Sequence, residues 1–262
     1  MNIALAGNPN CGKTTLFNEL TGSNGYVGNW PGVTVEKLEA PLREDRHVVL
    51  CDLPGIYSLS PYSPEEVVSR DYLLSGEPAV VIDVVDATNL ERNLYLTTQI
   101  LECGLPCVVA LNMVDLVEKA GDKIDVQELS VRLGCPVVPI SALRRRNLDE
   151  LVAAAKHAAA EKGQPPVADL FSAPVAGAVQ EISQVIAGFV PRKSQLAWYA
   201  VKAFEGERQA LEALGLPAAS VAAVDAARAG VEAQLDDDAE SLVTNDRYAW
   251  IERLMDQCVT KA

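Results

Sequence analysis

Short apolar segments alternate with helical patterns through the first 160 residues of the chain. Alternation of this kind predicts a parallel sheet with helices on both faces. Two of the segments, residues 36–42 and 47–52, are separated by a short charged turn and predict an antiparallel hairpin at the sheet edge. The sequence therefore predicts an α/β domain with a mixed, mostly parallel sheet. The expected parallel strands are residues 2–6, 48–52, 80–86, 106–112 and 137–140.

The pattern changes at residues 163–166, where Gly-Gln-Pro-Pro ends the last alternating unit. Beyond this point apolar residues recur at helical spacing and strand-like segments stop. We place a domain boundary here, between residues 1–165 and residues 166–262. The second domain is expected to be small and all-α, with about four or five helices, the last of which runs to Ala262. Its clearest apolar stripe consists of Val175, Val179, Ile182, Ile186 and Phe189.

The composition is acidic, with 22 Lys and Arg against 36 Asp and Glu in 262 residues and a net charge of −14. Apolar residues make up 49% of the chain, which is typical of globular proteins and disfavours disorder. A negative surface repels phosphate backbones, so nucleic acid is a poor candidate partner. The N-terminus lacks a signal-peptide pattern, apolar runs stay far below the roughly 18 residues of a membrane helix, and the cysteines are isolated. We therefore expect a soluble, cytoplasmic polypeptide.

A glycine-rich segment follows the first predicted strand and opens a helix. It fits the pattern G-x-x-x-x-G-K-S/T, in which backbone N–H groups and the helix N-terminus face phosphate groups. Lys13 would reach the β- and γ-phosphates, and the Thr14 hydroxyl would bind Mg²⁺. The position of the segment disfavours a chance glycine-rich turn. The predicted phosphate-binding residues are Gly7, Asn8, Pro9, Asn10, Cys11, Gly12, Lys13, Thr14 and Thr15.

A second motif would read the base. Asp115 follows the strand expected at residues 106–112, where its carboxylate could accept hydrogen bonds from the N1–H and 2-amino groups of guanine. Adenine lacks both donors, and sites built this way discriminate by roughly 10⁴-fold or more. Alone, Asn-x-x-Asp favours a capped turn, but in order after a P-loop it favours guanine binding. The predicted base contacts are Asn112, Met113, Val114 and Asp115, with Ser141, Ala142 and Leu143 supplying backbone N–H groups for guanine O6.

Two further segments are typical of nucleotide-dependent switches. In the first, Asp52 would hold Mg²⁺ through water and the Gly55 N–H would sense the γ-phosphate. In the second, a glycine-rich segment predicts a mobile loop from which Thr34 could close over the metal. Motifs of these kinds in this order identify a GTPase domain. The two segments contribute Asp52, Leu53, Pro54 and Gly55, and Gly32, Val33 and Thr34.

Ile56 stands where many GTPases have a Gln that orients the attacking water. We therefore expect slow intrinsic turnover unless positive charge comes from elsewhere. Asn10, with loop carbonyls of residues 28–32, could hold K⁺ beside the phosphates; the alternative is that Asn10 only stabilises the turn. The predicted catalytic residues are Asn10, Lys13, Thr34 and Gly55.

Three charged segments have both a functional and a structural interpretation. Glu65 and Glu66 could hold the attacking water, but Ser-Pro-Glu-Glu at residues 63–66 is typical of a helix start. The arginines at residues 144–146 predict a solvated loop facing the acidic surface. The aspartates at residues 236–238 could attract Fe²⁺, yet three successive carboxylates cannot share one helix face, which favours a solvated helix start.

Five segments together resemble the N-terminal cytoplasmic part of the bacterial ferrous iron transporter B (FeoB) family. They are GNPNCGKT at residues 7–14, NWPGVTVE at 29–36, DLPGIYSL at 52–59, NMVD at 112–115 and NDRYAWIE at 245–252. The resemblance implies a G domain, a helical domain likened to a guanine-nucleotide dissociation inhibitor, and a further membrane domain that moves Fe²⁺ across the inner membrane. It also implies GTP or GDP, Mg²⁺ and K⁺ as ligands, with K⁺ stimulating hydrolysis through Asn10.

The resemblance implies that the chain is a soluble fragment at the cytoplasmic face of the bacterial inner membrane, and we expect it to end where the family enters the bilayer. A monomer and a homo-trimer are both compatible with it. Three functions compete: a GTP-hydrolysing module that regulates or drives Fe²⁺ uptake, a K⁺-dependent GTPase of translation or RNA modification, and a GTPase whose second domain is a plain interaction module. The charge disfavours the second, because RNA-binding modules are usually basic.

Overall fold

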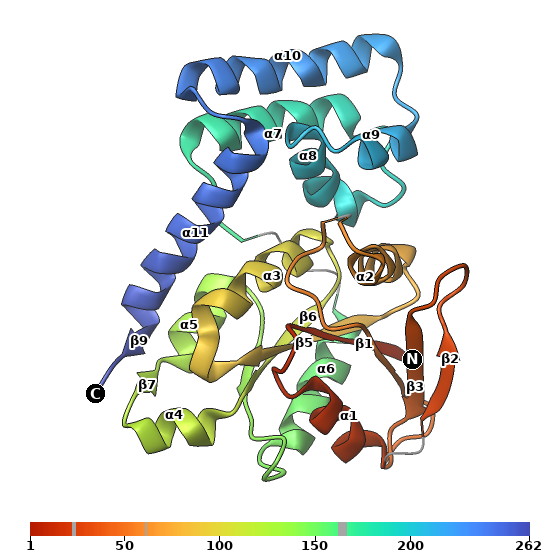
Figure 1. Cartoon of the computed structure of the whole chain (residues 1–262), viewed down its shortest axis with the longest axis vertical. Helices are drawn as coiled ribbons and strands as arrows, with labels where there is room; N and C mark the ends of the chain where they lie inside the picture. The colour runs from red at the N-terminus through yellow and green to blue at the C-terminus, as the bar shows by residue number, and fades with distance from the viewer. Residues whose placement is uncertain (23–24, 61, 162–166) are drawn as a thin grey trace.

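The computed structural model describes residues 1–22, 25–60, 62–161 and 167–262 (Figure 1). The predicted domain boundary, at residues 163–166, lies outside the described residues. Within the described ranges, no helix is both long enough and apolar enough to cross a membrane. An α/β part is followed along the chain by a group of helices, as the alternation and its end predict.

In the described chain, seven strands form one sheet in the spatial order β2-β3-β4-β1-β5-β6-β8. The pairs β4–β1, β1–β5, β5–β6 and β6–β8 are parallel, whereas β2–β3 and β3–β4 are antiparallel. The predicted mixed, mostly parallel sheet is confirmed, and the predicted hairpin is β3–β4, but the edge of the sheet is formed by β2 outside it. The strands are β1 (Asn2–Gly7), β2 (Tyr26–Asn29), β3 (Glu36–Pro41), β4 (Val49–Asp52), β5 (Val80–Asp86), β6 (Cys107–Asn112) and β8 (Val137–Pro139).

The edge strand β2 lies where the glycine content predicts only a mobile loop. It pairs with β3 from Tyr26 opposite Glu39 to Asn29 opposite Glu36. The prediction is wrong for this stretch, because a neighbouring strand supplies backbone partners that residue preferences do not reveal. The consequence is that the segment expected to close over the metal begins as an ordered edge of the sheet.

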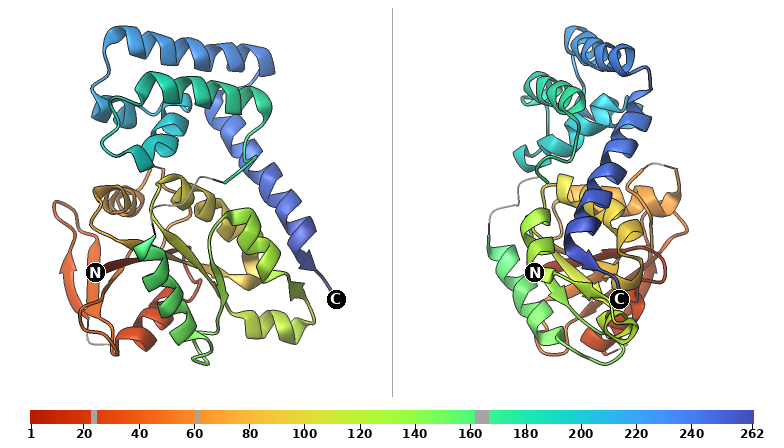
Figure 2. Two further views of the ribbon diagram at one scale, coloured as in Figure 1. Left: turned by 180° about the vertical axis from the view of Figure 1, so that it is seen from behind. Right: turned by 90° about the vertical axis from the view of Figure 1, so that its left-hand side faces the viewer.

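Helices cover both faces of the sheet (Figures 1 and 2). Along β1, Ile3 and Leu5 face a buried cluster shared with α1 and α6, while Ala4 and Ala6 face the cluster shared with α2, α3 and α5. This alternation fits a strand buried on both sides. The elements of this part are α1 (Lys13–Thr21), α2 (Pro64–Ser75), a 3₁₀ turn η1 (Ala87–Asn89), α3 (Leu90–Glu102), α4 (Val114–Ala120), α5 (Val126–Leu133) and α6 (Leu148–Ala160).

The second part is helical, as predicted, with five α-helices in the described residues. Helices α7 and α10 lie side by side and pack on α8, and Val175, Ile182 and Ile186 of the predicted stripe are buried (Figure 1). The elements are α7 (Ala173–Ile186), η2 (Lys193–Gln195), α8 (Leu196–Phe204), α9 (Arg208–Leu214), α10 (Ala218–Leu235) and α11 (Ala239–Cys258).

Helix α11 joins the two parts. It leaves the helical group and runs down the α/β part, where it contacts α3 and α5 (Figures 1 and 2). It does not run to Ala262 as expected: it ends at Cys258, and β9 (Val259–Thr260) pairs antiparallel with β7 (Lys123–Ile124). The expectation failed because a two-residue strand carries no periodic signal. The chain thus returns to the segment that follows α4.

Candidate nucleotide site

The predicted P-loop connects β1 to α1. Gly12 precedes the helix with φ of 90°, and a Cβ there would collide with the Asn112 amide, so only glycine fits. Asn10 also has a left-handed backbone, with φ of 67°. Burial raises the pKa of the Cys11 thiol to about 12, so Cys11 contributes its backbone rather than a reactive thiolate. The local geometry is that of a helix N-terminus aimed at an anion.

A cavity of about 590 Å³ opens beside this loop. It joins the P-loop to Gly55, which follows β4, and to Met113, which follows β6. Residues 32–34 do not line it, and Thr34 is exposed elsewhere at the sheet edge. The structure therefore brings most of the predicted phosphate-binding residues together with Gly55, but it does not add the predicted switch residues Gly32, Val33 and Thr34. The lining residues are Asn8, Pro9, Asn10, Gly12, Lys13, Thr14, Thr15, Gly55 and Met113.

Lys13 and Asp52 form an ion pair next to this cavity. The Lys13 ammonium donates to Asp52 Oδ1 at 2.5 Å, and the two side chains are 9% and 10% exposed. Burial raises the pKa of Asp52, and the neighbouring ammonium opposes that rise. The pair places a cation and a carboxylate, the two groups that a Mg²⁺-phosphate ligand needs, within reach of one another.

Asn112 connects three loops at the end of β6. Its amide donates to the Cys11 carbonyl at 2.8 Å, and its oxygen accepts the Ala142 N–H at 3.0 Å. Because Asn112 is only 3% exposed, these contacts fix the P-loop against the segment after β8. The tie to the P-loop agrees with the prediction. The Ala142 N–H, predicted to bind guanine O6, points instead at Asn112 in this conformation.

Asp115 lies in the first turn of α4, and its side chain is 14% exposed. The Arg144 guanidinium forms an ion pair with it at 2.9 Å, while Arg145 pairs with Glu19 and Arg146 with Glu118. The arginine loop thus faces acidic side chains, as predicted. Its contact with Asp115, the carboxylate predicted to bind the base, had no signal in the sequence, because 29 residues separate Asp115 from Arg144.

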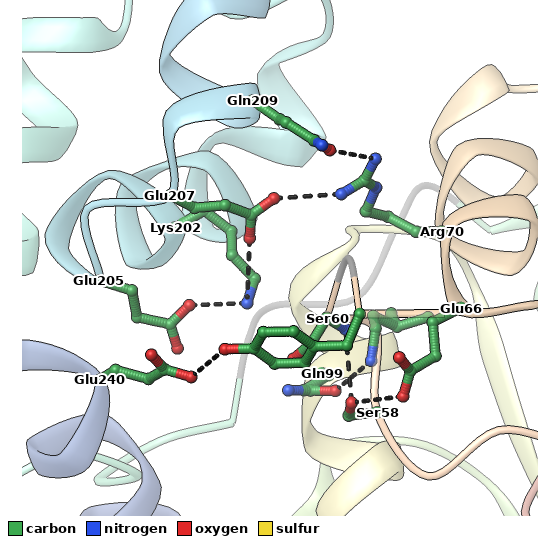
Figure 3. A network of polar contacts seen from close by, with 12 residues as sticks. Ser58, Ser60, Glu66, Arg70, Gln99, Lys202, Glu205, Glu207, Gln209 and Glu240 are labelled. Atoms are coloured by element: carbon green, nitrogen blue, oxygen red, sulfur yellow. Dashed lines mark hydrogen bonds and ion pairs between the residues drawn. The ribbon is translucent and has the colours of Figure 1, made fainter. Parts of the chain in front are cut away.

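Beyond Gly55, the segment after Asp52 packs into the protein and does not line the cavity. Ile56 is 3% exposed, so its side chain lies in the core. The buried Gln99 of α3 accepts the Leu59 N–H at 2.7 Å, a contact that the sequence did not indicate (Figure 3). Glu66 accepts from the Ser63 N–H, and Ser63 accepts from the Glu66 N–H, which is a capping box. The helix-start interpretation of residues 63–66 is confirmed.

The aspartates at residues 236–238 are exposed. Asp238 caps α11 by accepting the Ser241 N–H at 2.9 Å and the Ser241 hydroxyl at 2.8 Å. Among the described residues, no group of three His, Cys, Asp or Glu side chains is placed to hold a metal ion. The helix-start interpretation is confirmed for Asp238, whereas Asp236 lies at the C-terminal end of α10.

The fold and the motif positions define a P-loop GTPase G domain followed by a helical domain. Residues 1–155 match the family model described as ferrous iron transport protein B, and residues 171–260 match the FeoB cytosolic helical domain. The chain belongs to the ferrous iron transport protein B family. This membership favours the iron-transport interpretation over a GTPase of translation or RNA modification.

Relatives with similar sequences are described as Fe(2+) transporters. The chain is 41% identical to the Fe(2+) transporter FeoB of Escherichia coli K12 over 261 residues, covering 98% of this chain and 33% of that protein. It is 55% identical to the Salmonella typhimurium Fe(2+) transporter FeoB over 156 residues, covering 58% of this chain and 20% of that protein. The chain therefore spans about a third of the E. coli relative's length.

Solved structures cover nearly the whole chain. A mutant of S. thermophilus NFeoB bound to GDP superposes with a TM-score of 0.94 at 43% identity, covering 99% of this chain and 100% of that one. S. thermophilus NFeoB bound to GDP, AlF₄⁻ and K⁺ gives a TM-score of 0.86 at 44% identity, with coverage of 97% and 98%. These likenesses support a GTPase module.

Proposed function

We propose that this chain binds GTP, hydrolyses it slowly to GDP and phosphate, and thereby regulates or drives Fe²⁺ uptake through a membrane domain of the full-length protein. The P-loop cavity, with Lys13 and Asp52 beside it, is the observation that carries the proposal. In this proposal residues 1–165 hydrolyse GTP at the cytoplasmic face of the inner membrane, and residues 166–262 respond to the nucleotide. Association into a trimer stays a prediction.

Phosphate binding would separate the Lys13 ammonium from the Asp52 carboxylate. The ammonium can move from the carboxylate to the β- and γ-phosphates, because both groups lie beside the cavity. Asp52 and the Thr14 hydroxyl then offer hard oxygen ligands, which suit Mg²⁺. When bound, the Mg²⁺ ion would neutralise charge that develops on the phosphate oxygens. The Gly55 N–H, which lies next to Pro9 of the P-loop, would sense the γ-phosphate.

The attacking water needs a different orienting group from the usual Gln. The buried Ile56 side chain can neither donate nor accept a hydrogen bond, and Glu66 is engaged in its capping box. Asn10 lines the cavity and its side chain is exposed, so its amide oxygen is available to hold K⁺ beside the phosphates. When bound, K⁺ would supply the positive charge that an arginine finger supplies elsewhere. Slow turnover with K⁺ stimulation follows from this arrangement.

Contacts between the segment after Asp52 and the helical part support a regulatory role. The Tyr62 hydroxyl donates to Glu240 of α11 at 2.5 Å. On the neighbouring helix α2, Arg70 donates to Glu207 at 3.1 Å, and Lys202 also pairs with Glu207, at 3.5 Å (Figure 3). A change at the γ-phosphate would therefore reach the helical part through α2 and the segment before it.

Base selectivity provides the test. Asp115→Asn replaces an acceptor with an amide, which removes the match to the guanine N1–H and 2-amino donors and matches xanthine instead. We expect this variant to lose roughly 10²-fold or more in GDP affinity and to gain xanthosine diphosphate binding, measured by calorimetry. Glu118→Gln is the matched control, because Glu118 lies three residues after Asp115 on α4 and its carboxylate also pairs with an arginine, Arg146. Unchanged GDP binding by Asp115→Asn would contradict the proposed site.

A further inference from the structure

Trp30, in the segment before Thr34, packs into a site formed by Tyr72 of α2 and Lys37 of β3, which we call its seat. Its side chain is 7% exposed and meets the Tyr72 ring of α2 edge-on, with 5.0 Å between ring centres. The Lys37 ammonium of β3 lies 4.7 Å from the centre of the Trp30 ring and 5.8 Å from that of Tyr72. Glu39 holds this ammonium at 2.9 Å. The indole is thus held by packing and by a cation–π contact.

The backbone around Trp30 fixes the tip that carries Thr34. The Trp30 N–H donates to the Val35 carbonyl at 2.9 Å, which continues the β2–β3 ladder beyond Asn29 and Glu36. The Val33 N–H also donates to the Trp30 carbonyl, at 3.3 Å. Residues 31–34 therefore form a closed tip, and Thr34 lies outside the lining of the P-loop cavity. For Thr34 to reach that cavity, this closure has to open.

The buried core that contains Trp30 also contains side chains from the segment after Asp52. Trp30 lies in the same buried cluster as Leu53, Ile56 and Leu59, which follow Asp52. The indole N–H has no hydrogen-bond partner among the described residues, so the seat leaves one buried donor unsatisfied. An unpaired buried donor offsets part of the packing gain. Moving the Trp30 side chain out of the seat therefore costs less free energy than moving a core residue whose polar groups are all hydrogen-bonded.

We propose that Trp30 is a positioning residue for Thr34: seated between Lys37 and Tyr72 it holds the tip at the sheet edge, and closure of Thr34 over a γ-phosphate requires the indole to leave this seat. The inference rests on the proposed function, because only a nucleotide with a γ-phosphate gives Thr34 a reason to move. A nucleotide without that group leaves the seat occupied.

Tryptophan fluorescence tests the movement directly. The wild-type chain and Trp30→Phe are compared with GDP and with the non-hydrolysable analogue GMPPNP in Mg²⁺ and K⁺, and the difference between the two proteins isolates Trp30 from Trp198 and Trp250. We expect GMPPNP, but not GDP, to increase acrylamide quenching of the Trp30 signal. If GMPPNP binds tightly and the Trp30 signal matches that with GDP, this proposal falls while the proposed function stands. If GMPPNP fails to bind, both fall.

Affinities separate positioning from general stability. Phe packs less well in the seat and binds the ammonium more weakly, so Trp30→Phe should bind GMPPNP about two- to fivefold more tightly with unchanged GDP affinity. The gain should disappear in the Thr34→Ala background. Trp198→Phe, a buried indole of the helical part, is the control and should leave the ratio unchanged.

Two results would overturn the proposal: equal changes in GDP and GMPPNP affinity, or a gain that persists without the Thr34 hydroxyl. If Trp30→Phe does not fold, Lys37→Gln removes the same cation–π contact by removing the ammonium. It should shift the affinity ratio in the same direction, and an unchanged ratio in Lys37→Gln would refute the proposal.

Discussion

Replacing Glu102 with Gln should destabilise the junction between the two parts of the chain. Arg247 of α11 is 0% exposed and donates to the Glu102 carboxylate of α3, which is 2% exposed, at 2.8 Å. The amide would leave a buried guanidinium without a counter-charge, and breaking such pairs costs about 3–5 kcal/mol. We expect this loss in the free energy of unfolding, measured by urea titration followed by circular dichroism.

An exposed ion pair provides the control. Arg132 and Glu128 pair at 2.7 Å along α5 with side chains 50% and 37% exposed, so Glu128→Gln should cost less than about 0.5 kcal/mol. Similar losses for the two variants would refute the reasoning that burial sets the cost.

The double replacement of Arg247 by Met and Glu102 by Leu should be far milder than Glu102→Gln. Arg247 Nε and Glu102 Oε1 have no hydrogen-bond partners among the described residues, so the native pair is incompletely satisfied. Apolar replacements of incompletely satisfied pairs are often neutral or stabilising. A double variant as unstable as the single one would show that packing, rather than charge, decides this contact.

Two further predictions concern other buried charges. Burial raises the pKa of Asp83 from 3.8 to about 7, so between these pH values the folded chain keeps a proton that the unfolded chain has released. The free energy of unfolding should therefore fall by about 4 kcal/mol as the pH rises through that window. Urea titrations at successive pH values should show this fall in the wild type and not in Asp83→Asn. Arg70→Met removes the contact with Glu207 and should lower the free energy of unfolding by about 1–3 kcal/mol, whereas Asp71→Asn, at an exposed carboxylate, should change it by less than about 0.5 kcal/mol in the same assay.

Local patterns explain what the sequence could predict. The strand β1, the P-loop turn at Gly12 and the capping box of Ser63 and Glu66 each depend on neighbours within a few residues, so spacing and residue type reveal them. The apolar stripe of α7 is equally local. These elements define the fold class and place the phosphate-binding loop.

Contacts between distant segments explain the rest. The strand β2 depends on β3, and β9 depends on β7, which precedes it by more than a hundred residues. The pairing of Arg144 with Asp115 and the seat of Trp30 likewise join segments whose proximity exists only after folding. The position of Thr34 at the sheet edge follows from such contacts, which the motif alone does not reveal, while its closure over the metal stays a prediction.

GTP hydrolysis in KCl and in NaCl, by the wild-type chain and by Asn10→Ala, tests the central claim most directly. Because a K⁺ ion held by Asn10 would stabilise developing charge beside the phosphates, the wild type should turn over about tenfold or more faster in KCl. Asn10→Ala should hydrolyse GTP at the same slow rate in both salts, with GDP affinity retained. Equal wild-type rates in the two salts, or K⁺ stimulation that survives in Asn10→Ala, would contradict the account.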